Sequence, residues 1–284
     1  MSSNPHPVAA TVAGSDSGGG AGIQADLLSF AACGVHGATV IAAVTAQDTT
    51  AVHAVEAVSL EMVARQIDAV ATDLHPQAWK TGMLPTPEIV AVVAQRLEMH
   101  GAGNLVVDPV LRASTGAELA STAALVALRE ALLPLATVVT PNLAEAAALS
   151  GLPVRTPAEL LAAARAIAAM GPRFVVVTGG HGDPAEPQVT DLVLEAATGT
   201  VTPLSHPRLP GPDRHGTGCS FSAALAAFLA RGASPLDAAA SASAFVEAAL
   251  RRAPEGVGRG AGPLGHLAAE QAAPIVPAPQ PTLG

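Results

Sequence analysis

Short runs of β-branched residues alternate along this chain with longer stretches whose apolar residues recur at helical spacing. The short runs predict buried strands, and the longer stretches predict the helices that connect them. The predicted strands are Val8–Ala13, Ala38–Val44, Ala78–Thr81, Leu105–Asp108, Thr137–Thr140 and Phe174–Thr178. The predicted helices are Ile23–Ala32, Leu60–Leu74, Glu88–Met99, Thr122–Leu132 and Ala158–Ala169. This alternation predicts an α/β fold with a mostly parallel central sheet and helices on both of its faces.

The last third of the chain departs from this alternation. Leu192–Glu195 and Thr200–Pro203 are joined through Ala-Thr-Gly, which predicts an antiparallel hairpin added to the sheet. Two helices, Ser220–Ala230 and Leu236–Leu250, then close the domain. From Ala268 onward the sequence is rich in Pro and Ala without an apolar period, which predicts a disordered tail. We therefore expect one domain over residues 1–267 and a tail over 268–284.

Composition narrows the classes of partner. The 284 residues include 14 basic and 23 acidic side chains, a formal net charge of −9, and no run of Lys or Arg forms a basic stripe. A nucleic-acid partner is therefore not expected. The N-terminus does not resemble a secretory signal, and no apolar run reaches the ~18 residues of a membrane span. With two cysteines only, we expect a soluble cytoplasmic protein that contacts no membrane.

A glycine-rich segment, A-G-S-D-S-G-G-G-A-G-I-Q-A-D, follows the first predicted strand and opens a helix. Its residues Gly20–Ala25 satisfy the dinucleotide pattern G-x-G-x-x-A. However, Asp16 in the loop and Asp26, expected in the first helical turn, would repel a pyrophosphate. A neutral polar substrate fits this loop better. The structural alternative is a flexible glycine turn, with Asp26 placed by its favourable interaction with the helix dipole.

A second glycine motif, Gly216-Thr217-Gly218-Cys219, directly precedes an apolar helix. Backbone N–H groups at a helix start have no partner within the helix and carry partial positive charge, so this segment predicts an anion hole. The same field is expected to lower the pKa of the Cys219 thiol and to stabilise its thiolate. In the alternative interpretation Cys219 is a small buried apolar residue and the glycines form a turn.

A third segment, T-P-N-L-A-E, places Asn142 and Glu145 at a predicted helix start. They fit an N-cap residue and its capping-box partner. Alternatively, this amide and carboxylate orient Mg²⁺ and its waters around a triphosphate. The chain contains no G-x-x-x-x-G-K-[ST] motif and no zinc-ligand spacing, which excludes a Walker-type NTPase and argues against a structural zinc.

Taken in order, these motifs resemble those of hydroxymethylpyrimidine/phosphomethylpyrimidine kinases in the ribokinase superfamily. The glycine-rich segment is followed by V-T-A-Q, K-T-G-M-L, V-V-V-D-P-V, T-P-N-L-A-E-A, G-G-H and H-G-T-G-C-S-F-S-A-A-L. The resemblance covers Val8 to Leu267. It implies a single ribokinase-like three-layer α/β/α sandwich. It also implies that ATP and Mg²⁺ phosphorylate 4-amino-5-hydroxymethyl-2-methylpyrimidine and then its monophosphate, for thiamine biosynthesis.

The resemblance also implies roles for individual residues. The residues that would line the pyrimidine pocket are Gly14, Asp26, Gln47, Met83 and Val110. Those that would face ATP and Mg²⁺ are Asp108, Asn142, Glu145 and Thr178, with the metal near Asp108 and Glu145. Gly216, Thr217 and Gly218 would supply the anion hole, and Cys219 would accept the hydroxyl proton. Thr178 stands where the family usually has a lysine, and the resemblance further implies a homodimer.

Three alternative functions stay open at this level. A pyridoxal kinase of the same superfamily transfers phosphate to a similar primary alcohol on a heteroaromatic ring. The G-x-G-x-x-A match leaves a nucleotide-binding oxidoreductase, and a pocket that has lost its transfer activity would leave a non-catalytic pyrimidine-binding protein.

Overall fold

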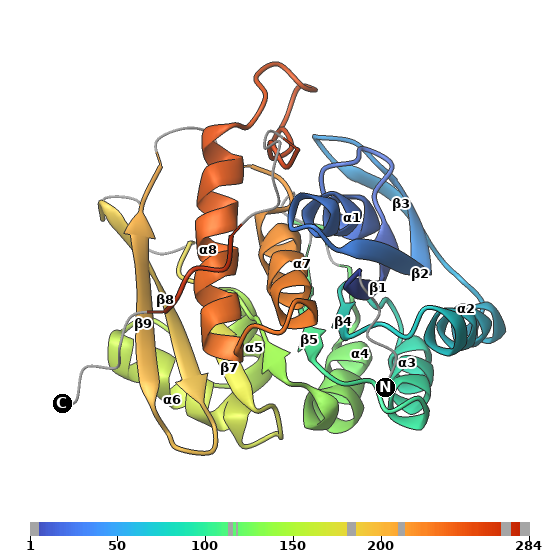
Figure 1. Ribbon diagram of the computed structural model, residues 1–284, viewed down its shortest axis with the longest axis horizontal. Helices are drawn as coiled ribbons and strands as arrows, with labels where there is room; N and C mark the ends of the chain where they lie inside the picture. Colours follow the sequence, from blue (N-terminus) through green and yellow to red (C-terminus); the bar gives the residue numbers. More distant parts are fainter. Residues whose placement is uncertain are drawn as a thin grey trace.

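The computed structural model describes residues 6–112, 116–117, 119–180, 186–209, 214–267 and 274–278. Its central element is a nine-stranded sheet with the order β3-β2-β1-β4-β5-β6-β7-β8-β9 (Figure 1). Six strands, in the order β2-β1-β4-β5-β6-β7, run parallel to one another. The edge strand β3 pairs antiparallel with β2, and at the other edge β8 pairs antiparallel with β7 and with β9. The sheet is therefore mixed, with the mostly parallel centre that the sequence predicts and the predicted hairpin at one edge.

The strands agree with the sequence pattern except at one edge of the sheet. Their bounds are β1 Val8–Ser15, β2 His36–Gln47, β3 Val52–Ala57, β4 Ala78–Thr81, β5 Leu105–Val107, β6 Val138–Val139, β7 Phe174–Val177, β8 Gln188–Glu195 and β9 Val201–Pro207. The sequence did not predict β3, because this edge strand is exposed at nearly every position and lacks the alternation that burial of one face imposes.

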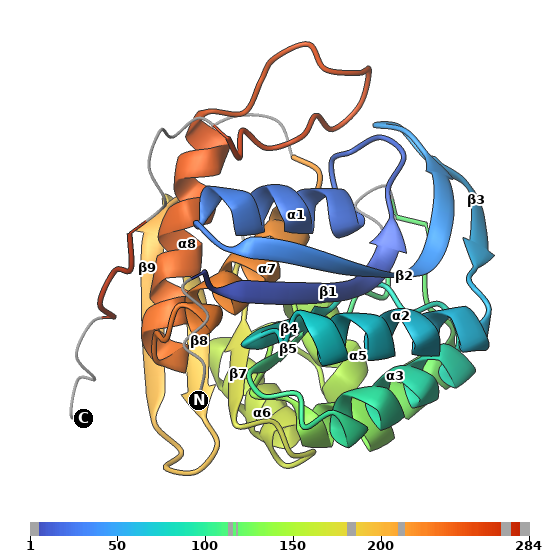
Figure 2. The same ribbon diagram turned by 45° about the vertical axis from the view of Figure 1, so that its right-hand side comes forward.

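Helices cover both faces of the sheet, which completes the expected three-layer sandwich (Figures 1 and 2). On one face lie α1 Gly22–Ala32, α7 Thr217–Ala230 and α8 Pro235–Arg251. On the other lie α2 Leu60–Asp73, α3 Pro87–Met99, α4 Thr122–Ala127, α5 Leu143–Ser150 and α6 Pro157–Ala168. The predicted helix Thr122–Leu132 is α-helical only to Ala127 and continues as a π-helical turn.

Each face of the sheet packs into its own apolar cluster. Alternation along β4 shows the division, since Trp79 belongs to the cluster beneath α2 and α3 and Ala78 to the cluster beneath α1, α7 and α8. Because successive side chains of a strand point to opposite faces, Lys80 is directed to the same side as Ala78, toward α1 and α7. A lysine is thereby placed inside the layer beneath α7.

The described residues of the predicted tail lie against helix α8. The Val276 N–H donates to Ser241 Oγ at 2.8 Å, and the Ala278 N–H donates to Asp237 Oδ1 at 3.0 Å. The other residues of the tail, and His181 of the G-G-H motif, lie outside the described residues. Among the described helices, none has the length and apolar character needed to cross a membrane.

Candidate active site

The sequence-predicted site residues follow the carboxyl ends of the parallel strands, at the end of the sheet where α7 begins. Gly14 in β1 and Met83 after β4 are neighbours, since a Cβ atom at position 14 would lie 2.9 Å from the Met83 sulfur. Gln47 ends β2, is 9% exposed, and accepts a hydrogen bond from Ser17 Oγ at its carbonyl, at 2.6 Å. These three residues lie at the carboxyl ends of the neighbouring strands β2, β1 and β4.

Val110 and Asp26, the other two residues predicted to line the pocket, differ in how deeply they are buried. Val110 follows β5 and is half-buried, with its N–H donating to the Asp108 carbonyl at 2.9 Å. Asp26 is fully buried, and α1 begins at Gly22, so the aspartate is the fifth residue of the helix and not part of the first turn as expected. The helix-dipole explanation for Asp26 is therefore wrong.

Asp26 instead pairs with Lys80, which is also fully buried. Both carboxylate oxygens of Asp26 lie 2.9 Å from Lys80 Nζ, and Thr11 Oγ1 donates to Oδ2 at 2.6 Å. Asp108 Oδ2 lies 3.8 Å from the same ammonium and accepts from Ser222 Oγ of α7 at 2.8 Å. One ammonium thus faces two buried carboxyl groups beneath the start of α7.

The charges of this cluster are coupled. Burial alone would lower the pKa of Lys80, but Asp26, Cys219 and Asp108 outweigh burial and raise it, so Lys80 keeps its proton. Burial raises the pKa of Asp26 as well, against the opposing effects of Lys80 and Thr11. We assign the ionised form to Asp26 because its oxygens accept three short hydrogen bonds. Among the described residues, the cation that lies near Asp108 is Lys80, at 3.8 Å, and Asp108 shares this ammonium with Asp26, which is closer to it.

Cys219 is the third residue of α7, and its sulfur accepts a hydrogen bond from the Gly22 N–H. The expected lowering of its pKa is wrong. Burial raises the thiol pKa to about 12, Lys80 opposes this rise, and Asp108 and Asp26 add to it. Desolvation and two neighbouring carboxyl groups thus outweigh the lowering by Lys80 and by the Gly22 N–H. Cys33 and Cys219 are both free.

The N-terminus of α7 is built by glycine. Gly216 is its N-cap with φ 82°, in the left-handed region, and a Cβ atom there would collide with the Gly20 carbonyl oxygen. The close approach brings the start of α7 against the glycine-rich loop. Thr217 and Gly218 form the first turn, where N–H groups have no partner within the helix. The predicted anion hole therefore has the required backbone conformation, next to Cys219.

Asn142 and Glu145 form the predicted capping box of α5. The Glu145 N–H donates to Asn142 Oδ1, and the Asn142 N–H donates to Glu145 Oε2, both at 2.9 Å. Burial raises the pKa of Glu145 to about 8, and Asp108 adds to the rise. Burial likewise raises the pKa of Asp108. Two buried carboxyl groups, one of which raises the pKa of the other, are a donor set suited to a hard divalent cation such as Mg²⁺.

Thr178 joins this side of the site through the backbone. It follows β7, forms a parallel bridge with Asn142, and donates its N–H to the Pro141 carbonyl at 3.0 Å. Its neighbour Gly179 donates to the buried Asp191 at 2.9 Å. The strand-end loops around Asn142 and Thr178 therefore lie side by side, as a nucleotide site shared between two loops requires.

The glycine-rich loop binds its own aspartate. Asp16 accepts hydrogen bonds from the N–H groups of Gly18, Gly20 and Ala21, at 2.8, 3.0 and 2.8 Å. These are N–H groups that would otherwise cradle a pyrophosphate. The structure therefore argues against the dinucleotide interpretation of the G-x-G-x-x-A match.

Sequence reasoning missed Lys80, Ser222 and His215 as members of the site. Lys80 is the only lysine of the chain, and both Lys80 and His215 begin motifs of the family resemblance, K-T-G-M-L and H-G-T-G-C. His215 directly precedes the predicted anion hole, is 6% exposed, and contacts both Gln47 and Asp16. Nothing in the spacing of these residues along the chain predicts that contact, because it joins segments far apart in sequence.

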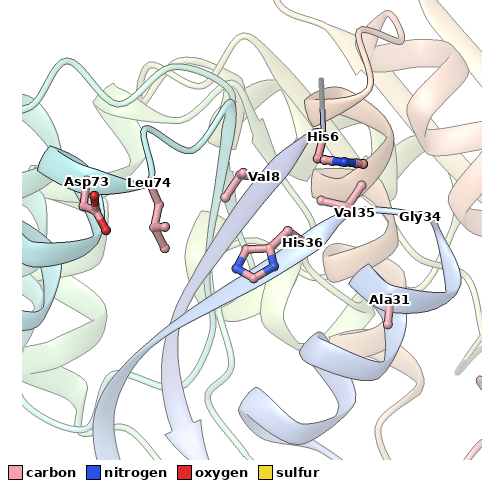
Figure 3. A pocket seen from close by; sticks show the side chains of 8 residues that line it. All are labelled: His6, Val8, Ala31, Gly34, Val35, His36, Asp73 and Leu74. Atoms are coloured by element: carbon pink, nitrogen blue, oxygen red, sulfur yellow. The ribbon is translucent and has the colours of Figure 1, made fainter. Parts of the chain in front are cut away.

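A hollow among the described residues lies elsewhere. It has a volume of about 520 Å³ and is lined mainly by residues at the amino ends of β1 and β2 and the end of α2, among them His6, His36 and Asp73 (Figure 3). Ligands of parallel sheets bind at the carboxyl ends of strands. This hollow is therefore separate from the candidate active site.

Comparison with known proteins identifies the family. The family model for phosphomethylpyrimidine kinase matches residues 16–265. A hydroxymethylpyrimidine/phosphomethylpyrimidine kinase of Rhizobium meliloti (strain 1021) is 47% identical over 262 residues, which cover 92% of this chain and 97% of the relative.

Two solved structures extend the comparison to the fold. The ADP complex of Bacillus subtilis pyridoxal kinase has a TM-score of 0.84 at 36% identity, over 92% of this chain and 97% of that one. Phosphomethylpyrimidine kinase of Clostridium difficile 630 has a TM-score of 0.75 at 34% identity, over 86% and 99%. The family match over most of the length, together with the arrangement of the strand-end residues, shows that this chain belongs to the phosphomethylpyrimidine kinase family.

Proposed function

We propose that this kinase transfers the γ-phosphoryl group of ATP to the primary hydroxyl of 4-amino-5-hydroxymethyl-2-methylpyrimidine, and then to the resulting monophosphate, for thiamine biosynthesis. The observation that carries the proposal is the placement of Cys219 and the anion hole at the start of α7, beside the Lys80–Asp26–Asp108 cluster. Phosphoryl transfer depends on positioning and on stabilisation of charge, and this end of the sheet supplies groups for both.

We assign each group a role in an in-line transfer. The residues that contact the pyrimidine are Gly14, Gln47, Met83 and Val110, with Asp26 supporting the pocket floor through Lys80. N–H groups of Gly216, Thr217 and Gly218 stabilise negative charge on the transferred phosphoryl oxygens. Cys219 accepts the proton of the attacking hydroxyl. Asn142 and Thr178 present the loops that hold the nucleotide.

Asp108 and Glu145 fit a magnesium ion, because both are buried carboxyl groups whose pKa values are raised. When bound there, Mg²⁺ would neutralise phosphate charge and would offset the Asp108 charge that raises the Cys219 pKa. Lys80 lies 3.8 Å from Asp108 and lowers the pKa of Cys219. A bound Mg²⁺ and Lys80 would thus together favour proton acceptance by Cys219, against the effects of burial and of the neighbouring carboxyl groups.

The direct test is an assay of the purified protein with Mg-ATP and the hydroxymethylpyrimidine. We expect the monophosphate and then the diphosphate to form, resolved by chromatography and by release of ADP. Binding of the pyrimidine without any phosphorylated product would contradict the proposal and favour a non-catalytic binding protein.

Pyridoxal is the second candidate substrate, and a specific observation favours it. The similar solved structures include the pyridoxal kinase of Bacillus subtilis and a Staphylococcus aureus pyridoxal kinase in complex with AMP-PCP and pyridoxal, with a TM-score of 0.83. The 47% identity to the Rhizobium kinase exceeds the 36% and 33% identity to these two, so we favour the pyrimidine. A competition assay with both alcohols measures the ratio of the two kcat/KM values, and turnover of pyridoxal alone would reverse the assignment.

Glu145→Gln is expected to raise the Mg²⁺ concentration needed for half-maximal activity by about tenfold or more, since loss even of a group that only supports a metal ligand typically costs about 10- to 100-fold in metal affinity. The amide keeps the capping contact to the Asn142 N–H and so preserves α5. The measurement is a Mg²⁺ titration of kcat at fixed ATP. Glu159→Gln is a matched control, because Glu159 occupies the equivalent capping-box position of α6, away from the site. An unaltered Mg²⁺ requirement in Glu145→Gln would place the metal elsewhere.

We also propose that the protein is a cytoplasmic homodimer that pairs through the β3 edge of the sheet. Large apolar side chains are exposed around this edge, which is outermost in Figure 2. They are Val44, Val55, Leu60 and Met62, at 52, 42, 41 and 50% exposure. Sedimentation should give the mass of two chains, and Val55→Lys should shift it to one. A wild-type mass of one chain would refute the dimer.

A further inference from the structure

We propose that His215 is a positioning residue that fixes the orientation of the Gln47 carboxamide, so that the substrate pocket presents an N–H donor to an acceptor nitrogen of a heteroaromatic ring. The inference rests on the proposed function in one respect, the role of Gln47 in the pocket. The orientation itself follows from contacts among residues of the chain.

His215 is held firmly in place. Its backbone N–H donates to the Gly262 carbonyl at 3.0 Å, and its ring lies against Gly20, where a Cβ atom would come within 2.8 Å of Cδ2. The residue is 6% exposed, and Gly216 follows it directly as the N-cap of α7. The imidazole thus lies between the glycine-rich loop, the end of β2 and the start of the helix.

A single ring nitrogen, Nε2, faces two polar groups. Asp16 Oδ2 lies 3.2 Å away, and the terminal nitrogen of the Gln47 carboxamide lies 2.7 Å away. An imidazole nitrogen either carries a hydrogen and donates or has a lone pair and accepts, and it cannot do both. The charge of Asp16 therefore decides which role Nε2 takes.

Asp16 is ionised. Burial would raise its pKa, but hydrogen bonds from His215 and from the N–H groups of Gly18 and Ala21 outweigh burial and lower it. A carboxylate only accepts hydrogen bonds, so the contact with His215 requires a hydrogen on Nε2. This holds whether the imidazole is neutral or cationic. A protonated Nε2 cannot accept from an amide, and Gln47 must therefore turn its oxygen, Oε1, toward His215.

The hydrogen bonds of Thr45 lead independently to the same orientation of the Gln47 carboxamide. Its Oγ1 donates its single hydrogen to the Ser15 carbonyl at 2.8 Å, and the other terminal atom of Gln47 lies 3.4 Å from that Oγ1. Having used its hydrogen, the Thr45 hydroxyl can only accept. A half-turn of the carboxamide, which exchanges its oxygen and nitrogen, satisfies His215 and Thr45 together. The amide nitrogen then has one hydrogen for Thr45 and one for a ligand.

This orientation selects a class of ligand. A ring that offers an sp² nitrogen acceptor gains a hydrogen bond from Gln47, whereas a ring with an N–H at that position would leave two donors facing each other. Buried sites built to hydrogen-bond a ring discriminate strongly against analogues that leave a polar group unpaired. His215 contributes to this selectivity without touching the substrate.

The first experiment needs no substrate. Long-range ¹H–¹⁵N correlation of the histidine rings in the wild-type protein, with His215→Gln to assign the signal, reports whether Nε2 of His215 carries a hydrogen. We expect that it does. A lone pair on Nε2 would overturn the proposal, even if the enzyme phosphorylates the pyrimidine as proposed.

The second experiment is a double-mutant cycle on binding and turnover of the hydroxymethylpyrimidine. His215→Phe removes the donor and is expected to raise the substrate KM about tenfold, the equivalent of ~1.4 kcal/mol, with a smaller change in kcat. His215→Gln keeps an N–H near the place of Nε2 and should recover most of the affinity. In a Gln47→Ala background, His215→Phe should add little, because the group that it positions is gone. Fully additive effects would overturn the proposal. If the wild type fails to phosphorylate the pyrimidine, this result contradicts the proposed function alone. The same double-mutant cycle is then measured on the affinity for pyridoxal.

Discussion

Cys219→Ala is expected to lower kcat about 10²- to 10⁴-fold, the range that general base catalysis contributes, while the KM values for both substrates change little. The sulfur lies at the start of α7, beside Lys80 and Asp108, where the hydroxyl of a bound alcohol would meet the phosphoryl group. Alanine removes the proposed proton acceptor without altering the backbone of the proposed anion hole. Single-turnover measurement of phosphoryl transfer separates this loss from changes in binding or product release.

The pH dependence of kcat is a second test of Cys219 as the proton acceptor. A thiol accepts a proton only after it has lost its own, and the Cys219 pKa is raised to about 12. The deprotonated fraction therefore grows as pH rises, and kcat should increase from neutral to alkaline pH. Cys219→Asp supplies a base with an unperturbed pKa of ~3.9, so this alkaline increase should flatten while activity is partly restored. A Cys219→Ala enzyme with unaltered turnover, or a Cys219→Asp enzyme with the wild-type profile, would show that the thiolate is not the base.

The sequence predicted the sheet well where burial imposes a pattern. Strands β1 and β4 read as buried β-branched or apolar runs because helices cover both of their faces. The edge strand β3 was missed because its exposed side chains obey no such constraint. Hydrophobic periodicity reports burial and carries little information about a strand held mainly by backbone hydrogen bonds at an open edge.

The candidate site was predictable in part for a similar physical reason. Glycines, caps and strand ends leave local signals, and the capping box of Asn142 and Glu145 is a feature of four consecutive residues. The pKa of Cys219 is not local. Its sign is decided by burial and by Asp108 and Asp26, which the fold brings from other segments. Helix-terminus reasoning alone therefore predicted a shift in the wrong direction.

Lys80→Met is expected to destabilise the fold by about 3 to 5 kcal/mol, the usual cost of breaking a buried ion pair from one side. The substitution removes the ammonium that lies 2.9 Å from both oxygens of Asp26. The Asp26 carboxyl group then stays buried, with the hydrogen bond from Thr11 Oγ1 left to it. Urea unfolding measures the loss as a lower midpoint. Arg251→Met is the matched control, because Arg251 pairs with Glu247 on the exposed surface of α8, where the expected cost is at most about 1 kcal/mol.

A second substitution separates the structural role of Lys80 from its catalytic one. Lys80→Met with Asp26→Asn removes both charges and keeps an oxygen for Thr11, so most of the lost stability should return. Activity should not return with it, because the same ammonium also lies 3.8 Å from Asp108 and lowers the pKa of Cys219. If Lys80→Met costs no more than Arg251→Met, the pair contributes nothing to folding. If the double variant regains both stability and turnover, Lys80 serves the fold alone and Cys219 does not depend on its charge.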